Sequence, residues 1–114
     1  MAIPFVSGAI VVLYLQGPRE KVWGVLQDLG PAGVSLRGLD LSSFDDWLRG
    51  VSSGEDSILP STAFYPLARV EKILLDEASD GVPSLDDLCR DRTGTGLRAL
   101  VEGGRGQVQK GGAP

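Results

Sequence analysis

The chain has 114 residues, of which 42% are hydrophobic and 23% charged, so it has enough apolar surface for one compact domain and is too short for two large ones. It contains no histidine and one cysteine, Cys89, which excludes histidine general bases, histidine-rich metal sites and an intrachain disulfide within this chain. The net charge is −4, and residues 1–89 carry six basic against thirteen acidic side chains, a balance that disfavours non-specific binding of nucleic-acid phosphates.

The first predicted element is a short apolar strand over residues 10–15, rich in β-branched side chains and followed by the turn residues Gly17 and Pro18. Because the run is nearly continuous, we expect this strand to be buried on both faces. It is much shorter than the roughly 20 apolar residues of a membrane-spanning helix, and it lacks the basic start and cleavage site of a signal peptide. Together with the single thiol, this pattern predicts a cytoplasmic protein without a membrane partner.

Residues 21–29 predict a long second strand that contains a glycine, Gly24. A glycine inside a strand commonly marks a bulge or a bend, so we expect the strand to curve at Gly24 around a small barrel. The turn-rich residues 30–33 then lead into a half-buried third strand, which alternates apolar and polar side chains from Val34 and reaches Leu39 or Leu41.

Two short helices are predicted from apolar spacing and from capping residues. In residues 42–51 four apolar side chains recur at helical spacing, after Ser42 as the cap, and in residues 84–91 Ser84 takes the same place. Each helix has two aspartates in its first turn, where the helix dipole favours negative charge. We therefore interpret the aspartate pairs as part of the helix starts and not as an acid–base pair. The four apolar residues of the first helix are Phe44, Trp47, Leu48 and Val51.

Residues 62–67 and 69–75 predict a fourth and a fifth strand, with Pro66 at an edge or bend because proline donates no hydrogen bond to a ladder. This completes a single domain over residues 1–92, with the helical insertion at about 42–51. Residues 93–114 are rich in glycine, and we expect them to form a flexible tail.

Two stretches of the chain follow the order of features found in one group of small barrels. Residues 13–36 combine an apolar strand, a glycine-containing turn, a strand with an internal glycine and a four-residue turn, and residues 64–73 have the form of a tight connection between a fourth and a fifth strand. In these stretches the chain resembles the Sm-like and SH3-like small β-barrels, including the Sm fold of the bacterial RNA chaperone. The resemblance implies a mainly β fold, a small five-stranded antiparallel barrel with a short inserted helix and a short C-terminal helix. It also implies rings in which strand four of one subunit pairs with strand five of the next.

The positions that read RNA in that family are not retained. Sm-like proteins that bind uridine-rich RNA carry an acidic residue and an asparagine near the turn between strands two and three, whereas this chain has only glycine, proline and alanine at 30–33. Where the bacterial chaperone has a tyrosine followed by a lysine–histidine pair, this chain has Tyr65, Pro66 and Leu67. Only Tyr65 carries over, as a stacking surface. The inserted helix also follows strand three, whereas the family places its helix before strand one.

A barrel of this size has room inside only for its own side chains, which argues against a substrate pocket and against catalysis. We therefore expect a non-catalytic binding or assembly module that has no cofactor or metal and forms homo-oligomers through its strand edges. For Trp47, capping the open end of the barrel is an equally weighted alternative to an interface role. The side chains expected at the subunit interface are Trp47, Phe44, Phe64, Tyr65, Ile73 and Leu75.

The alternative function is that of an RNA-binding Sm-like regulator. In that case Tyr65 would stack on a base, and Arg37, Arg69 and Lys72 would contact phosphates. The acidic body disfavours this alternative, and DNA is not an expected partner. Cys89 is interpreted as buried packing and not as a reactive thiol.

Overall fold

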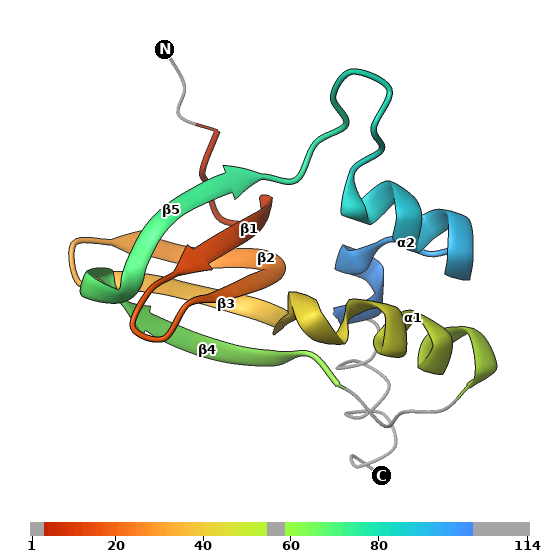
Figure 1. Cartoon of the computed structure of the whole chain (residues 1–114), viewed down its shortest axis with the longest axis horizontal. Helices are drawn as coiled ribbons and strands as arrows, with labels where there is room; N and C mark the ends of the chain where they lie inside the picture. The colour runs from red at the N-terminus through yellow and green to blue at the C-terminus, as the bar shows by residue number, and fades with distance from the viewer. Residues whose placement is uncertain (1–3, 55–58, 102–114) are drawn as a thin grey trace, which may run out of the picture.

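The structure is a computed structural model that describes residues 4–54 and 59–101. Its main feature is one antiparallel sheet of five strands (Figure 1). Across the sheet the strands lie in the order fourth, third, second, first and fifth, as numbered along the chain. Short 3₁₀ turns, η1 (Leu41–Ser43) and η2 (Leu67–Arg69), follow the third and fourth strands. The predicted mainly β fold, with five antiparallel strands and short helices, is confirmed. The strands are β1 (Ile10–Leu15), β2 (Glu20–Gly30), β3 (Gly33–Asp40), β4 (Ser61–Pro66) and β5 (Val70–Leu75), and the helices are α1 (Phe44–Ser53) and α2 (Leu85–Thr93).

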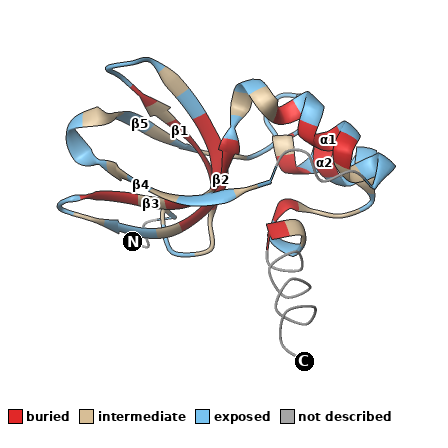
Figure 2. Ribbon diagram, turned by 90° about the horizontal axis from the view of Figure 1, so that it is seen from below, coloured by how far each residue is buried: buried red, intermediate tan, exposed pale blue. Residues whose placement is uncertain are grey.

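The side chains of β1 alternate between two apolar cores, one on each face of the sheet. Because successive side chains of a strand point to opposite faces, Val11 and Leu13 enter one core while Ile10 and Val12 enter the other. The expectation that this strand is buried on both faces is therefore confirmed, and Figure 2 shows buried residues on β1, β2 and β3 as well as on the helices. We call the first the inner core; its buried residues are Val11, Leu13, Leu15, Val22, Leu26, Val34 and Leu36.

The second core lies on the face of the sheet that the helices cover, and we call it the helix-side core. Figure 1 shows α1 and α2 side by side at one end of the sheet. Burying this much apolar surface between a sheet and two short helices is what holds the helices in place, since helices of about ten residues are marginal on their own. The buried residues of the helix-side core are Ile10, Val12, Trp23, Val25, Leu39, Phe44, Trp47, Leu48, Cys89, Leu97 and Val101.

The sheet has two edges, β4 and β5, and no ladder joins them within the described residues. The turn η2 connects the two strands and is held from both sides. The Leu67 N–H donates to the carbonyl of Ala32 at 2.9 Å, and the Gln16 N–H donates to the carbonyl of Arg69 at 2.8 Å. The five-stranded antiparallel sheet is thus established, whereas closure into a barrel stays a prediction.

Gly24 allows a close approach between two strands. It lies directly opposite Gly38, and a Cβ atom at Gly24 would be 2.5 Å from the carbonyl oxygen of Arg37. A Cβ at Gly38 would be 2.0 Å from the carbonyl oxygen of Trp23. The register of β2 and β3 is regular at Gly24 and shifts further along, between Leu26 and Asp28. The β2–β3 ladder therefore has no bulge at Gly24, and the bend expected there stays a prediction. The glycine is needed because the backbones are too close for a side chain.

The two helix starts differ in how they are capped. At α2 the Ser84 hydroxyl accepts from the Asp87 N–H at 2.9 Å, and the Asp87 carboxylate accepts from the Ser84 N–H at 3.2 Å, which confirms the predicted cap. At α1 the N-cap residue is Ser43, and its side chain makes no capping hydrogen bond. Ser42, predicted as this cap, instead lies in η1, where Asp40 accepts from its N–H and from its hydroxyl.

Residues 97–101 form a further helical turn and are part of the core. Leu97 is fully buried and Val101 is 2% exposed, and both belong to the helix-side core. The prediction of a flexible tail from residue 93 is therefore wrong for residues 93–101, because the apolar stripe in this segment packs against the helices. The rest of the predicted tail, residues 102–114, lies outside the described residues.

Candidate functional site

The two aromatic residues of α1 that were expected at a subunit interface are buried within the chain. Trp47 is 3% exposed and Phe44 is 8% exposed. Both rings meet the indole of Trp23 edge to face, at centroid distances of 5.8 Å for Trp47 and 5.1 Å for Phe44. The interface expectation is corrected for these two residues, because the chain itself covers them. Trp47 holds α1 against the sheet instead.

A carboxylate that the sequence did not single out, Asp76, ties the sheet to α2. Its Oδ2 accepts from the Trp23 indole N–H at 3.1 Å and from the Asp86 N–H at 2.8 Å, and its Oδ1 accepts from the Leu85 N–H at 2.8 Å. These donors belong to the middle of the sheet and to the first turn of α2. Asp76 follows β5 directly, so in the sequence it is indistinguishable from an aspartate that ends a strand.

Asp86 in turn ties α2 to the last described segment, residues 97–101. It is 9% exposed, and its Oδ1 accepts from the buried N–H of Leu97 at 2.7 Å while its Oδ2 faces Arg90 Nε at 3.3 Å. A carboxylate engaged in this way positions backbone and is not a free general base. This agrees with the interpretation of the aspartate pair in α2 as structural.

The other expected interface residues lie on the edge strands and divide into two groups. Phe64 on β4 is 55% exposed. Tyr65, Ile73 and Leu75 are only partly exposed and pack against the inner core. An additional apolar residue of β5, Leu74, is 42% exposed and was not predicted to matter. Exposed apolar side chains are therefore present on both edges of the sheet.

The cations proposed for RNA phosphates each engage a different part of the fold. Arg37 donates to the Thr62 hydroxyl at 3.1 Å, between β3 and β4. Arg69 donates to the carbonyls of Gln16 and Pro18 at 3.1 and 2.7 Å, and so fixes the turn between β1 and β2. The structure does not bring these two arginines together into one phosphate site.

Tyr65, the expected stacking residue, lies half-buried over the inner core beside negative charge. Burial raises the pKa of its phenol, and the carboxylates of Glu20 and Asp40 raise it further, against the opposing effect of Arg69. Two carboxylates near the ring repel a phosphate. The geometry therefore offers no support for RNA binding at Tyr65.

The remaining predicted cation, Lys72, belongs to a group that the sequence did not reveal. Its ammonium lies 4.7 Å from the centre of the Tyr14 ring, and the ammonium of Lys21 lies 4.9 Å from the same point. Tyr14 pairs in register with both lysines, so the three side chains form one row across β2, β1 and β5. The only signal for this row is the strand register, because 51 positions separate the two lysines.

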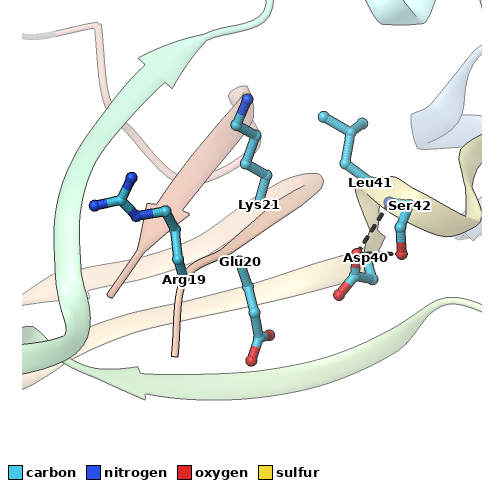
Figure 3. Close-up of a pocket in the computed structure, with 6 residues that line it drawn as sticks. All are labelled: Arg19, Glu20, Lys21, Asp40, Leu41 and Ser42. Atoms are coloured by element: carbon cyan, nitrogen blue, oxygen red, sulfur yellow. Dashed lines mark hydrogen bonds between the residues drawn. The ribbon is translucent and has the colours of Figure 1, made fainter. Parts of the chain in front are cut away.

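An open hollow of about 530 Å³ lies beside Lys21 (Figure 3). The side chains of Arg19 and Lys21 extend to one side of it, and the carboxylates of Glu20 and Asp40 extend to the other. Both carboxylates are engaged, Glu20 with Arg69 at 3.4 Å and Asp40 with Ser42. The positive and negative charges around the hollow are thus separated. The hollow is lined by Arg19, Glu20, Lys21, Asp40, Leu41 and Ser42.

Cys89 is fully buried in the helix-side core, as interpreted from the sequence. Its Sγ donates to the Thr95 carbonyl at 3.3 Å. Burial raises the pKa of the thiol, an effect only partly opposed by the Thr93 hydroxyl. A neutral, enclosed thiol is a poor nucleophile.

Within residues 4–54 and 59–101, no three histidine, cysteine, aspartate or glutamate side chains gather into a group that could hold a metal ion. Over the same residues, no helix has the length and apolar character needed to cross a membrane. A scan against protein-family models, a search of curated proteins and a search of solved structures found no match to this chain. Its function is therefore inferred from its own geometry.

Proposed function

We propose that this chain is a non-catalytic assembly module whose copies associate through the edges of β4 and β5. The proposal is based on the unpaired and partly apolar edges of these two strands. Each has a ladder on one side only among the described residues, and each exposes a large apolar side chain, Phe64 on β4 and Leu74 on β5. Monomeric proteins usually protect sheet edges with charge, proline or bulges, because an open edge is a template for pairing.

The β4 edge is also free of charge, which supports an apolar partner. Residues 29–36 and 59–68 contain no charged side chain, although the protein as a whole is acidic. Phe64 lies over the turn glycine, since a Cβ at Gly33 would be 2.8 Å from its Cζ atom. Leu67, at 48% exposure, extends the apolar surface beyond the strand. A contact here gains hydrophobic burial in addition to main-chain hydrogen bonds.

Pairing of β4 with β5 of another copy uses two different surfaces of each subunit. Such a heterologous contact continues from copy to copy and gives a closed ring when the rotation allows it. This is the arrangement implied by the resemblance to Sm-like barrels, and the barrel and the ring are both part of the proposal.

The non-catalytic part of the proposal is supported by how the polar groups are used. Asp76 and Asp86 accept backbone N–H groups, Ser84 and Asp87 cap α2, and Cys89 is enclosed. None of these groups lines the hollow beside Lys21.

The test is the mass of the full chain in solution, measured by size-exclusion chromatography with light scattering over a range of concentrations. We expect a mass several-fold above the 12.0 kDa of one chain. Phe64→Lys and Leu74→Lys, which place a charge on each edge, are expected to shift the mass toward one chain. Val82→Lys is the matched control, because Val82 is 65% exposed and lies outside both edge strands. A single-chain mass at every concentration would contradict the proposal.

A further inference from the structure

We propose that Lys21 and Lys72, which flank the Tyr14 ring, and Arg19, which lines the hollow beside Lys21, together bind the diphosphate group of a small molecule. We call these four residues the cation cluster. The row of Lys21, Tyr14 and Lys72 lies on the face of the sheet that also carries the helices, and it is distinct from the proposed apolar surface on β4. The inference goes beyond assembly, because it assigns a ligand to the chain.

The first support is the convergence of like charges. Both lysine ammoniums lie within 5 Å of one ring centre, at 4.9 and 4.7 Å, so their separation cannot exceed the sum of these two distances. Bringing two cations together raises the electrostatic energy, and the ring of Tyr14 compensates only in part. Because Tyr14 stands between the two lysines in the row, an anion that contacts both ammoniums beyond the edge of the ring would offset this repulsion.

The second support is that the cations are left without carboxylate partners in a protein rich in acid. Arg19, Lys21 and Lys72 form no salt bridge within the described part of the chain, where the three salt bridges involve Arg49, Arg69 and Arg90. Next to the cluster, Glu20 and Asp40 turn away from Lys21 (Figure 3). The fold therefore turns these two carboxylates away from Lys21.

The third support concerns the size and charge of the ligand. Three cations match the charge of a diphosphate better than that of a single phosphate, and the Tyr14 hydroxyl adds a donor. The open hollow beside Lys21, of about 530 Å³, is lined by Arg19 and Lys21 but not by Tyr14 or Lys72, and it leaves room for the rest of a small ligand next to the lysines. A long polyanion would also interact with the rest of a chain whose net charge is −4, which repels it. These features favour a small ligand over a nucleic-acid strand.

Isothermal titration calorimetry of the full chain with pyrophosphate and with ADP tests the proposal at low ionic strength. We expect both to bind, more tightly than inorganic phosphate. Lys21→Gln and Lys72→Gln should each weaken pyrophosphate binding roughly tenfold, as expected for the loss of one charge-assisted contact. Tyr14→Phe should weaken it several-fold. Arg92→Gln is the matched control, because it removes an exposed cation of α2 far from the cluster in the sequence.

Several results would overturn the proposal. These are no heat of binding with pyrophosphate, equal affinity for phosphate and pyrophosphate, or an equal effect of Arg92→Gln and Lys21→Gln. Binding of a single-stranded RNA oligomer that depends on the lysines, without binding of pyrophosphate, would assign the cluster to a strand instead. Because Lys72 lies on β5, the mass of each variant is measured by light scattering in parallel. Loss of ligand binding with an unchanged mass separates this site from the assembly surface.

Discussion

The indole N–H of Trp23 donates to the carboxylate of Asp76 across 3.1 Å, and this bond joins the middle of the sheet to the start of α2. Trp23 is fully buried, so its N–H has no access to water. The same carboxylate accepts the N–H groups of Leu85 and Asp86. One side chain thus satisfies a buried donor and two donors of a helix N-terminus, which backbone geometry alone leaves unpaired.

Replacing Asp76 should therefore destabilise the fold far more than a surface substitution does. Asp76→Ala leaves the Trp23 indole and the N–H groups of Leu85 and Asp86 without their acceptor, at an expected cost of about 2–4 kcal/mol in the free energy of unfolding. Urea unfolding followed by tryptophan fluorescence measures this change. Glu77→Ala, at the adjacent exposed position, is the control and should change stability by less than about 0.5 kcal/mol. Equal effects of the two substitutions would refute the role of Asp76.

The contact of Gly24 with Gly38 should tolerate no side chain. In Gly38→Ala the new methyl group would lie 2.0 Å from the Trp23 carbonyl oxygen, which forces β2 and β3 apart. We expect a loss of about 3 kcal/mol or more, measured by thermal or urea unfolding. Gly30→Ala is the control, because a Cβ there meets nothing within 4 Å. A Gly38→Ala protein as stable as Gly30→Ala would show that the strands can separate without cost.

The segment after α2 should contribute to stability through Leu97. Leu97→Ala removes a fully buried side chain from the helix-side core, with an expected cost of about 2–5 kcal/mol. A chain ending at residue 92 should be less stable still, whereas one ending at residue 101 should keep most of the stability. Leu88→Ala is the comparison, since Leu88 is 37% exposed. Unfolding curves that coincide for the chains ending at 92 and 101 would exclude a structural role for this segment.

The raised pKa of Cys89 should make stability decrease at alkaline pH. Burial is the main cause of the rise, so the folded protein keeps the thiol neutral above its ordinary pKa of 9.0, while the unfolded chain ionises there. The unfolded state then binds fewer protons, and the stability that is complete below pH 9.0 is lost as the pH rises through the folded pKa. The phenol of Tyr65, whose pKa is also raised, adds to this loss above 10.0.

Urea unfolding of the wild type and of Cys89→Ala, at a series of pH values on both sides of 9.0, tests this effect. The variant is expected to lose stability less steeply with pH, whatever its stability at neutral pH. Parallel curves for the two proteins would show that the thiol does not contribute. Labelling with a thiol reagent gives an independent measurement, because Cys89 should react slowly until the protein unfolds.

The strands, both helices and the Ser84 cap were predictable because each depends on neighbours in the sequence. Alternation, apolar spacing and turn residues act over a few positions, so residues 10–15 and 84–91 carry their own signals. The same local patterns did not predict the segment whose structure depends on tertiary packing. The stripe that contains Leu97 is too weak to specify a helix alone, and it is ordered by contact with α1, α2 and the sheet.

The sequence by itself determined the kinds of element, their order and the absence of histidine chemistry. Only the tertiary structure decided that Trp47 faces inward, that Asp76 reaches Trp23 and that Lys72 stands beside Lys21 on one tyrosine ring. Each of these depends on the register between strands or on the docking of a helix. Register joins residues that are about 50 positions apart, and it is selected by the burial of whole strand faces, so no local pattern encodes it.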